Sequence, residues 1–295
     1  MPNLILGIVS SFKKIPVLSS WTARTLPSSS YWNPVAFGNG YFVTAADYSS
    51  NGAYSSDNGA TWSSASMPSN SRWQGMAYGN GTFVAIANST SNFAYSTNGT
   101  SWSGGSMPAN IGWNGVAYGA GVFVAIANNS TTYATSTNGT SWTSRTAPIS
   151  TQAITFANGK FVAVKYGDTQ MMYSSDGISW TTSSMPSAGN WNFVTGDNGL
   201  FVAAVEGSNT ISYSSNGSSW TNATVGSGAT GGLVAGGGVF VIVRSGSSNS
   251  YWSTDAITWN SATLPSSDSW VKMAYGNNTF ATVVYGANKA ATATI

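Results

Sequence analysis

Short apolar runs recur along the chain between clusters of Gly, Asn and Ser, and helical periodicity is absent. In one example, Trp73–Tyr78 alternates apolar with polar or small residues, Gly79-Asn80-Gly81 follows, and Thr82–Ile86 is mostly apolar. Alternation is typical of a strand with one buried face, and a continuous apolar run is typical of a strand buried on both faces. Asn-Gly between such runs favours a tight hairpin, because both residues tolerate positive φ. The pattern predicts short antiparallel strands.

The pattern repeats with a period near 40 residues. Two anchors in each repeat, a Trp that ends a turn motif and a Phe in an apolar run, recur at intervals of 38 to 41 residues. The Trp anchors are Trp21, Trp62, Trp102, Trp142, Trp180, Trp220 and Trp259, and the Phe anchors are Phe42, Phe83, Phe123, Phe161, Phe201, Phe240 and Phe280. This period, with four strands in each repeat, indicates a propeller blade. We therefore expect an all-β, seven-bladed β-propeller of four-stranded blades over residues 20–295.

The two ends of the propeller are expected to complete one blade together. The first repeat contributes only a last strand around Trp21, whereas the final repeat contributes Trp270–Tyr275, Thr279–Tyr285 and Ala290–Ile295 without a fourth strand. If the N-terminal strand closes the last blade, the ring has no exposed strand edges.

Composition removes several functional classes. Only 6% of the residues are charged, against roughly 25% in an average soluble protein, and the net charge is +2. The basic residues are scattered, so no nucleic-acid-binding face is expected. No run approaches the roughly 18 apolar residues that span a bilayer, so no membrane-inserting segment is expected. Cys and His are both missing, which excludes disulfides, Cys/His zinc sites and Ser-His-Asp triads. We expect no cofactor and no metal site.

One turn motif, Ser55-Ser-Asp57-Asn-Gly59-Ala-Thr61-Trp62, has the full pattern Ser-x-Asp-x-Gly-x-Thr-Trp, and the other copies are one residue shorter. The acidic position is occupied by Asp or Asn without preference, and either side chain can bond nearby backbone N–H groups. A structural turn tolerates this exchange, whereas catalysis or metal binding would not. The positions assigned to structural turns are Asp57, Asn98, Asn138, Asp176, Asn216 and Asp255.

This motif resembles the Asp-box, or bacterial neuraminidase, repeat of sialidase-like propellers. The resemblance implies three Arg around a substrate carboxylate, a Tyr/Glu pair and an acidic Asp. This chain has a single Glu, and its four arginines fall in no family motif around one centre: Arg24, Arg72, Arg145 and Arg244. Other glycosidases usually need two nearby carboxylates. Three acidic residues near loops could share a surface, although we favour their interpretation as ordinary solvated charges: Asp47, Asp168 and Glu206. We predict that the chain is not an enzyme, with a sialidase-like glycoside hydrolase as the weaker alternative.

A second Trp series follows the box Trp by 11 residues and is broken in two repeats, near Ala153 and Gly232. Its members are Trp32, Trp73, Trp113, Trp191 and Trp270. Connectors between blades usually share one face, so these Trp residues are a candidate glycan-binding face, where aromatic rings stack on sugars and amides bond hydroxyls. The alternative is that they pack at the blade interface, since Trp is highly buried on average.

The opening MPNLILGIVSS, followed by repeats rich in Ser, Thr, Gly and Asn, resembles the virion structural proteins of tailed bacteriophages. The resemblance implies a non-enzymatic tail, fibre or capsid-surface component of the virion that displays a recognition or protective surface, with host surface polysaccharide as a ligand. Residues 1–19 would form an arm that docks onto other virion proteins through Leu4, Ile5, Leu6, Ile8 and Val9. The alternatives are a flexible terminus and a free, secreted glycan-binding lectin.

Overall fold

The computed structural model describes residues 15–228 and 230–295, and it contains strands but no helix in these two ranges. The strands are β1 (Thr22–Gly38), β2 (Tyr41–Ala46), β3 (Ser49–Ser55), β4 (Ser63–Gly79), β5 (Thr82–Asn88), β6 (Thr90–Ser96), β7 (Ser103–Ile111), β8 (Trp113–Gly119), β9 (Val122–Ala127), β10 (Thr132–Ser136), β11 (Thr143–Thr146), β12 (Ala153–Ala157), β13 (Lys160–Val164), β14 (Tyr166–Ser174), β15 (Thr181–Asp197), β16 (Leu200–Val205), β17 (Thr210–Ser214), β18 (Thr221–Thr224), β19 (Thr230–Gly236), β20 (Val239–Ser253), β21 (Asn260–Gly276) and β22 (Thr279–Thr294). No helix that could cross a bilayer is found in these residues.

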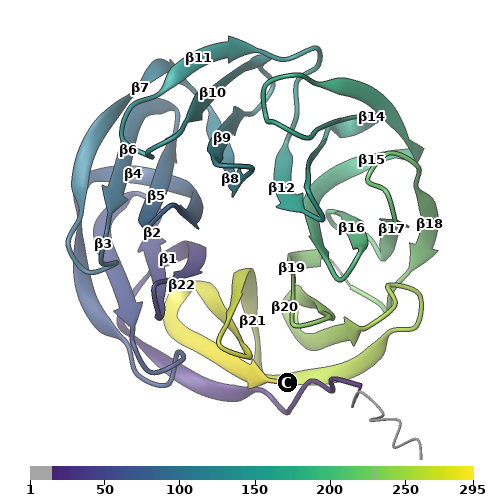
Figure 1. Cartoon of the computed structure of the whole chain (residues 1–295). Helices are drawn as coiled ribbons and strands as arrows, with labels where there is room; N and C mark the ends of the chain where they lie inside the picture. Colours follow the sequence, from purple (N-terminus) through teal and green to yellow (C-terminus); the bar gives the residue numbers. More distant parts are fainter. Residues whose placement is uncertain (1–14, 229) are drawn as a thin grey trace, which may run out of the picture.

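The strands stand around a central axis and form a ring (Figure 1). Every pairing between neighbouring strands is antiparallel, as short hairpin connections require. Long strands such as β4 and β15 pair with one neighbour through their first half and with the next through their second half. Hydrogen bonding therefore runs from repeat to repeat, and the strands join into sheets of 11, 4 and 7 strands.

The first and last strands lie side by side in the largest sheet (Figure 1). The first half of β1 pairs with the end of β22, with Thr22 opposite Thr292 and Ala23 opposite Ala291. Next to this pairing, the Ser19 N–H donates to the Thr294 carbonyl oxygen at 2.7 Å. The ring is thus continuous in hydrogen bonding at the place where the two ends of the sequence meet.

The core follows the apolar runs of the second strand in each repeat. The seven Phe anchors are at most 1% exposed. They pack both within a repeat and against its neighbour. Phe83 lies next to Tyr78 and the box residue Trp102 of its own repeat, and its cluster includes Ala36 and Val43 from the preceding repeat. A strand buried on both faces needs this continuous apolar sequence.

Neighbouring repeats also interlock through a glycine and an aromatic ring. A Cβ atom on Gly79 would lie 2.0 Å from Cγ of Tyr118, so the ring of the next repeat occupies the space that a side chain would need. The same contact occurs at five junctions, and these pairs are Gly38–Tyr78, Gly79–Tyr118, Gly119–Phe156, Gly236–Tyr275 and Gly276–Phe37. At one junction both residues are small, with Ala157 in the glycine position and Gly196 in the aromatic position. Close packing of complementary shapes therefore sets the spacing of the repeats.

Candidate functional site

The five Trp residues proposed as a glycan-binding face lie in the core, so that assignment is corrected. Trp32, Trp73, Trp113 and Trp191 are 0% exposed, and Trp270 is 1% exposed. Each stands across a strand pair from a small or β-branched residue, as Trp113 does from Ala127, which leaves room for the indole. The indole N–H of Trp113 donates to the Ala109 carbonyl oxygen at 3.0 Å. With both faces enclosed, these rings cannot stack on a sugar, and the alternative of packing at the blade interface describes them.

Arg244 takes the place of the missing Trp in the sixth repeat. Thr230 stands where five other repeats have Trp, and its cross-strand partner is Arg244 instead of a small or β-branched residue. The guanidinium is fully buried and donates to the Val225 carbonyl oxygen at 2.6 Å and to Thr230 Oγ1 at 2.6 Å. Burial lowers the pKa of this arginine from its usual value. The Arg244 side chain on the second strand of this repeat thus fills the volume that the Trp indole fills from the first strand in other repeats.

The box residues form the hydrogen bonds of a turn. The Asp57 carboxylate accepts from the Ser55 hydroxyl at 2.7 Å and from the Thr61 N–H at 2.9 Å. In the shorter boxes the same position accepts from two backbone N–H groups, whether it is Asp or Asn; the residues are Asn98, Asn138, Asp176, Asn216 and Asp255. These bonds hold the pKa of Asp57 and of Asp176 at about 2.

The proposed docking residues of the arm, Leu4, Ile5, Leu6, Ile8 and Val9, lie outside the described residues. Of the arm, the structure describes residues from Ile15 onward, and the Ile15 side chain is 68% exposed. Three residues later Leu18 is buried in a cluster with the box residue Trp21.

A ring of carboxamide side chains lines one mouth of the central channel. Six of the seven first strands, all except β12, contain a β-bulge directly after the position of the buried Trp or of Thr230, for example between Trp113 and Gly115. A bulge redirects the side chains around it, and here the residue after the Trp position turns toward the channel. In five of the seven repeats this residue is Asn or Gln, and all five line the cavity at this mouth: Asn33, Gln74, Asn114, Gln152 and Asn192.

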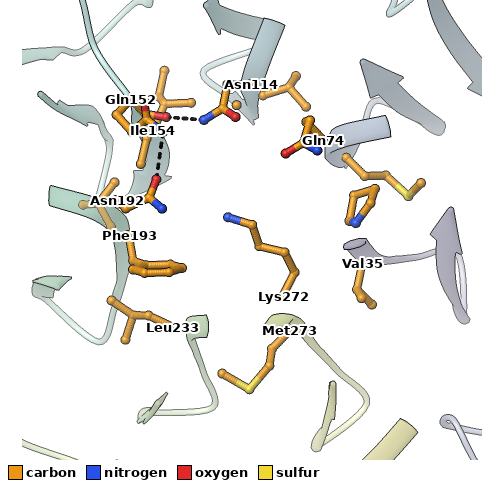
Figure 2. Close-up of a pocket in the computed structure, with 17 residues that line it drawn as sticks. Val35, Gln74, Asn114, Gln152, Ile154, Asn192, Phe193, Leu233, Lys272 and Met273 are labelled. Carbon is orange, nitrogen blue, oxygen red and sulfur yellow. Dashed lines mark hydrogen bonds between the residues drawn. The ribbon is translucent and has the colours of Figure 1, made fainter. Parts of the chain in front are cut away.

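Hydrogen bonds hold part of this ring in place (Figure 2). The Asn114 amide donates to the Gln152 backbone carbonyl oxygen at 2.8 Å, and the Gln152 amide donates to Asn192 Oδ1 at 3.0 Å. The Gln74 amide donates to both carboxylate oxygens of Asp47, at 3.0 and 2.8 Å. Since each carboxamide has both donors and an acceptor, bonding capacity remains for a ligand.

The cavity itself has a deep part and an open part. The deep part, of about 170 Å³, is lined by apolar residues such as Met76 and Met273 as well as by the carboxamides. The open part, of about 500 Å³, reaches the loops at the mouth and includes Arg72 and Glu206. Its volume is within the range of about 300 to 1,000 Å³ typical of small-molecule sites.

Lys272 extends into the channel from β21, with Nζ 5.1 Å from the centre of the Phe193 ring (Figure 2). Burial lowers the pKa of the Lys272 ammonium from its usual value, and the negative charge of Glu206 acts in the opposite direction. The channel wall at this mouth thus combines one cation with neutral amides, and Glu206 lies among the lining residues.

Asp47 is the buried carboxylate next to the ring. It is 2% exposed, and Arg72 lies 3.8 Å away, measured from Nε to Oδ2. Burial raises the pKa of Asp47 to about 6, although the Gln74 hydrogen bond and the charge of Arg72 act to lower it.

The remaining charged candidates do not meet at one centre. Arg24 bonds Thr292 and Arg145 bonds Thr135, both on outer strands, while Asp168 forms an ion pair with Lys165 at 2.8 Å. Within residues 15–228 and 230–295, no group of three or more acidic residues is placed to hold a metal ion.

Sequence reasoning missed the carboxamides and Lys272, although their signal lies beside a pattern that it found. The five carboxamides occupy the position after the second Trp series, or after Thr151 in the fourth repeat, which has no Trp there. Lys272 lies two residues after Trp270. The prediction named the Trp of each pair, whereas the polar residue that follows it lines the channel.

Comparison with known proteins supports a propeller fold. No protein-family model and no curated protein sequence matches the chain. Virginiamycin B lyase from Staphylococcus aureus is similar in structure, with a TM-score of 0.82 and 10% identity over 94% of this chain and 99% of the lyase. YCF48 bound to D1 peptide gives a TM-score of 0.74 with 14% identity, covering 96% and 99% of the two chains. The WD40 domain of Neurospora crassa Pan2 gives 0.70 with 5% identity, covering 95% and 97%.

The chain therefore has an all-β fold of the β-propeller class, as predicted. The prediction that the chain is not an enzyme is wrong. A streptogramin B lyase, which is an enzyme, is similar to this chain in structure, with a TM-score of 0.82. At 10% identity this likeness concerns the fold, and it assigns no reaction. The names of the three structures mention neither an Asp-box repeat nor a bacteriophage, so those resemblances stay predictions.

Proposed function

We propose that the strands divide into seven four-stranded blades and that one mouth of their central channel binds carbohydrate. The blade count is supported by the strand register. The first half of β1 pairs with β22 and its second half pairs with β2, so that one long strand serves as the outer strand of one blade and the inner strand of the next. The strands β4, β15 and β21 are divided in the same way.

The ring of five carboxamides is the observation that carries the binding proposal. Amide groups both donate and accept, so they match the hydroxyl groups of a sugar, which also do both. Phe193 and apolar residues such as Val35 lie below the ring in the cavity and can contact the C–H face of a sugar. Polar groups at fixed positions above an apolar floor are typical of ligand sites.

The alternative that a related fold suggests is an enzyme of the lyase type. In the Staphylococcus aureus lyase, a variant with alanine in place of a histidine is described as catalytically inactive in a complex with quinupristin. This chain contains no histidine, so we transfer neither that reaction nor that substrate. Three proposals rest on the sequence resemblance alone. The protein is part of a virion or, alternatively, a secreted lectin, and residues 1–19 dock onto other virion proteins.

A glycan array probed with the labelled full-length chain tests the proposal. We expect binding to a limited set of polysaccharides and its loss in the double variant Asn114→Ala, Gln152→Ala. The matched control is Asn80→Gly, which changes a turn residue with a φ of 45° at the opposite end of a first strand. Equal binding by the double variant would place the ligand elsewhere, and no binding to any glycan would contradict a carbohydrate function.

A further inference from the structure

We propose that Lys272 and the Asn192 amide together bind a carboxylate group inside the channel, so that the ligand is an acidic saccharide. This inference rests on the proposed carbohydrate function, whose ligand class it narrows. It concerns the inner part of the cavity, where both side chains contribute to the lining.

Lys272 is exceptional at its position in the repeat. The six equivalent positions, two residues after the Trp position, are occupied by Pro34, Gly75, Gly115, Ala153, Phe193 and Gly232. None of these carries a charge, and most are small. The single long cation therefore reaches into a space that the other repeats leave open, where Figure 2 shows it extending toward Asn192.

Among the described residues, the ammonium group forms no ion pair within 4 Å, and the charge of Glu206 acts on it from farther away. The three ion pairs found in residues 15–228 and 230–295 involve Arg72, Lys165 and Lys289. The contact that the structure gives to Lys272 Nζ is the face of Phe193 at 5.1 Å. Lys272 is half-buried, and a half-buried cation without a direct ion pair gains from one, so a bound anion would supply the missing partner.

A second donor is already oriented beside it. Gln152 Nε2 donates to Asn192 Oδ1 at 3.0 Å, which fixes the Asn192 carboxamide and leaves its N–H groups to donate into the cavity. The Asn192 side chain and Lys272 converge on the same part of the channel (Figure 2). A cation and an amide at neighbouring positions can each bond one oxygen of a carboxylate.

The local charge favours an anion with one negative charge. Lys272 contributes one positive charge, and Arg72 at the mouth is engaged with Asp47. Glu206 also lies at the mouth, where it would repel a phosphate or another dianion more strongly than a carboxylate. A uronic acid within a polysaccharide combines one carboxylate with the hydroxyl groups that the carboxamide ring can bond.

The test compares oligogalacturonate with its fully methyl-esterified form, which keeps the sugar chain and removes the charge. Binding is followed by isothermal titration and by NMR of 13C-labelled methionine methyl groups, because Met76 and Met273 line the cavity. We expect the acid to bind at least about tenfold more tightly than the ester, the effect of one charge-assisted hydrogen bond. Lys272→Met should remove this preference, and Lys272→Arg should retain most of it.

The outcomes separate the two proposals. Equal binding of acid and ester would overturn the carboxylate site and leave the carbohydrate function standing. If neither oligosaccharide binds but glucuronate and acetate shift the Met76 and Met273 signals in the Lys272-containing protein alone, the carboxylate site is supported and the carbohydrate function falls. No signal shift with any of these probes would overturn both. The acid preference should also decline as rising pH removes the proton from Lys272.

Discussion

Asp47 should make the protein less stable as the pH rises from 4.5 to 7.5. Its pKa is raised from 3.8 to about 6 in the folded protein, so the folded state holds a proton that the unfolded state releases. The stabilisation from this proton is fully present below pH 3.8 and is lost as the pH rises through about 6. The chain has no histidine, which is the side chain whose ordinary pKa falls within this range.

The magnitude follows from the shift. A difference of about two pKa units corresponds to roughly 3 kcal/mol in total, of which about 2 kcal/mol falls between pH 4.5 and 7.5. For 295 residues the unfolding entropy is about 0.6 kcal/mol/K, so the melting temperature should fall by roughly 3 °C over this interval. Burial causes the shift, since Asp47 is 2% exposed and its one nearby cation, Arg72, is 3.8 Å away.

Scanning calorimetry at pH 4.5, 5.5, 6.5 and 7.5 measures this slope for the wild type and for Asp47→Asn. The neutral variant should show a flat profile across the range and should match or exceed the wild type at pH 7.5. Asp57→Asn is the matched control, because the pKa of Asp57 is about 2 and its contribution is lost only in stronger acid. A slope that persists in Asp47→Asn, or a rise of stability toward pH 7.5 in the wild type, would refute the reasoning.

Three further predictions concern packing and turns, each measured by urea denaturation. Gly79→Ala should destabilise the fold by about 1 to 3 kcal/mol through its clash with the Tyr118 ring. Adding Tyr118→Gly should remove the clash, because the pair then matches the natural Ala157–Gly196 pair at another junction. If the losses of stability from the two substitutions simply add, this explanation is contradicted. Arg244→Ala should cost more than about 2 kcal/mol, and Thr230→Trp in the same chain should recover part of it by restoring the Trp–small pair; no recovery would contradict the exchange of roles. Asp176→Asn should change stability by less than about 1 kcal/mol at pH 7, since Asn fills this position in other boxes, and a larger loss would mean that the charge matters.

The sequence predicts the fold well because each repeat encodes the same local choices. Asn-Gly turns, the apolar Phe runs and the box motifs specify strands and hairpins without reference to distant residues, and the structure has strands at these places. The pairing of β1 with β22 also follows from counting the strands in the first and last repeats. Repetition of a pattern makes each prediction consistent with the others, which a single copy could not do.

The candidate site was harder to predict because, in most repeats, side-chain direction depends on the β-bulge that follows the Trp position. In a regular strand Trp113 and Asn114 would face opposite sides of a sheet, and nothing in the sequence says which side faces the channel. The bulge and the curvature of the ring decide this, and both arise from packing between repeats. Lys272 was overlooked for a related reason, since a lone lysine becomes notable only when its distant surroundings are known.

The pairing of Thr22 with Thr292 also has a consequence for the folding of this protein during its synthesis on the ribosome. The two residues are 270 positions apart (292 minus 22), and synthesis proceeds at about 5 to 20 residues per second, so roughly 15 to 55 s separate their appearance. During this interval the nascent chain carries an incomplete ring whose first outer strand lacks its neighbour. We expect the unfinished chain to need protection from association with other chains until its last strand emerges.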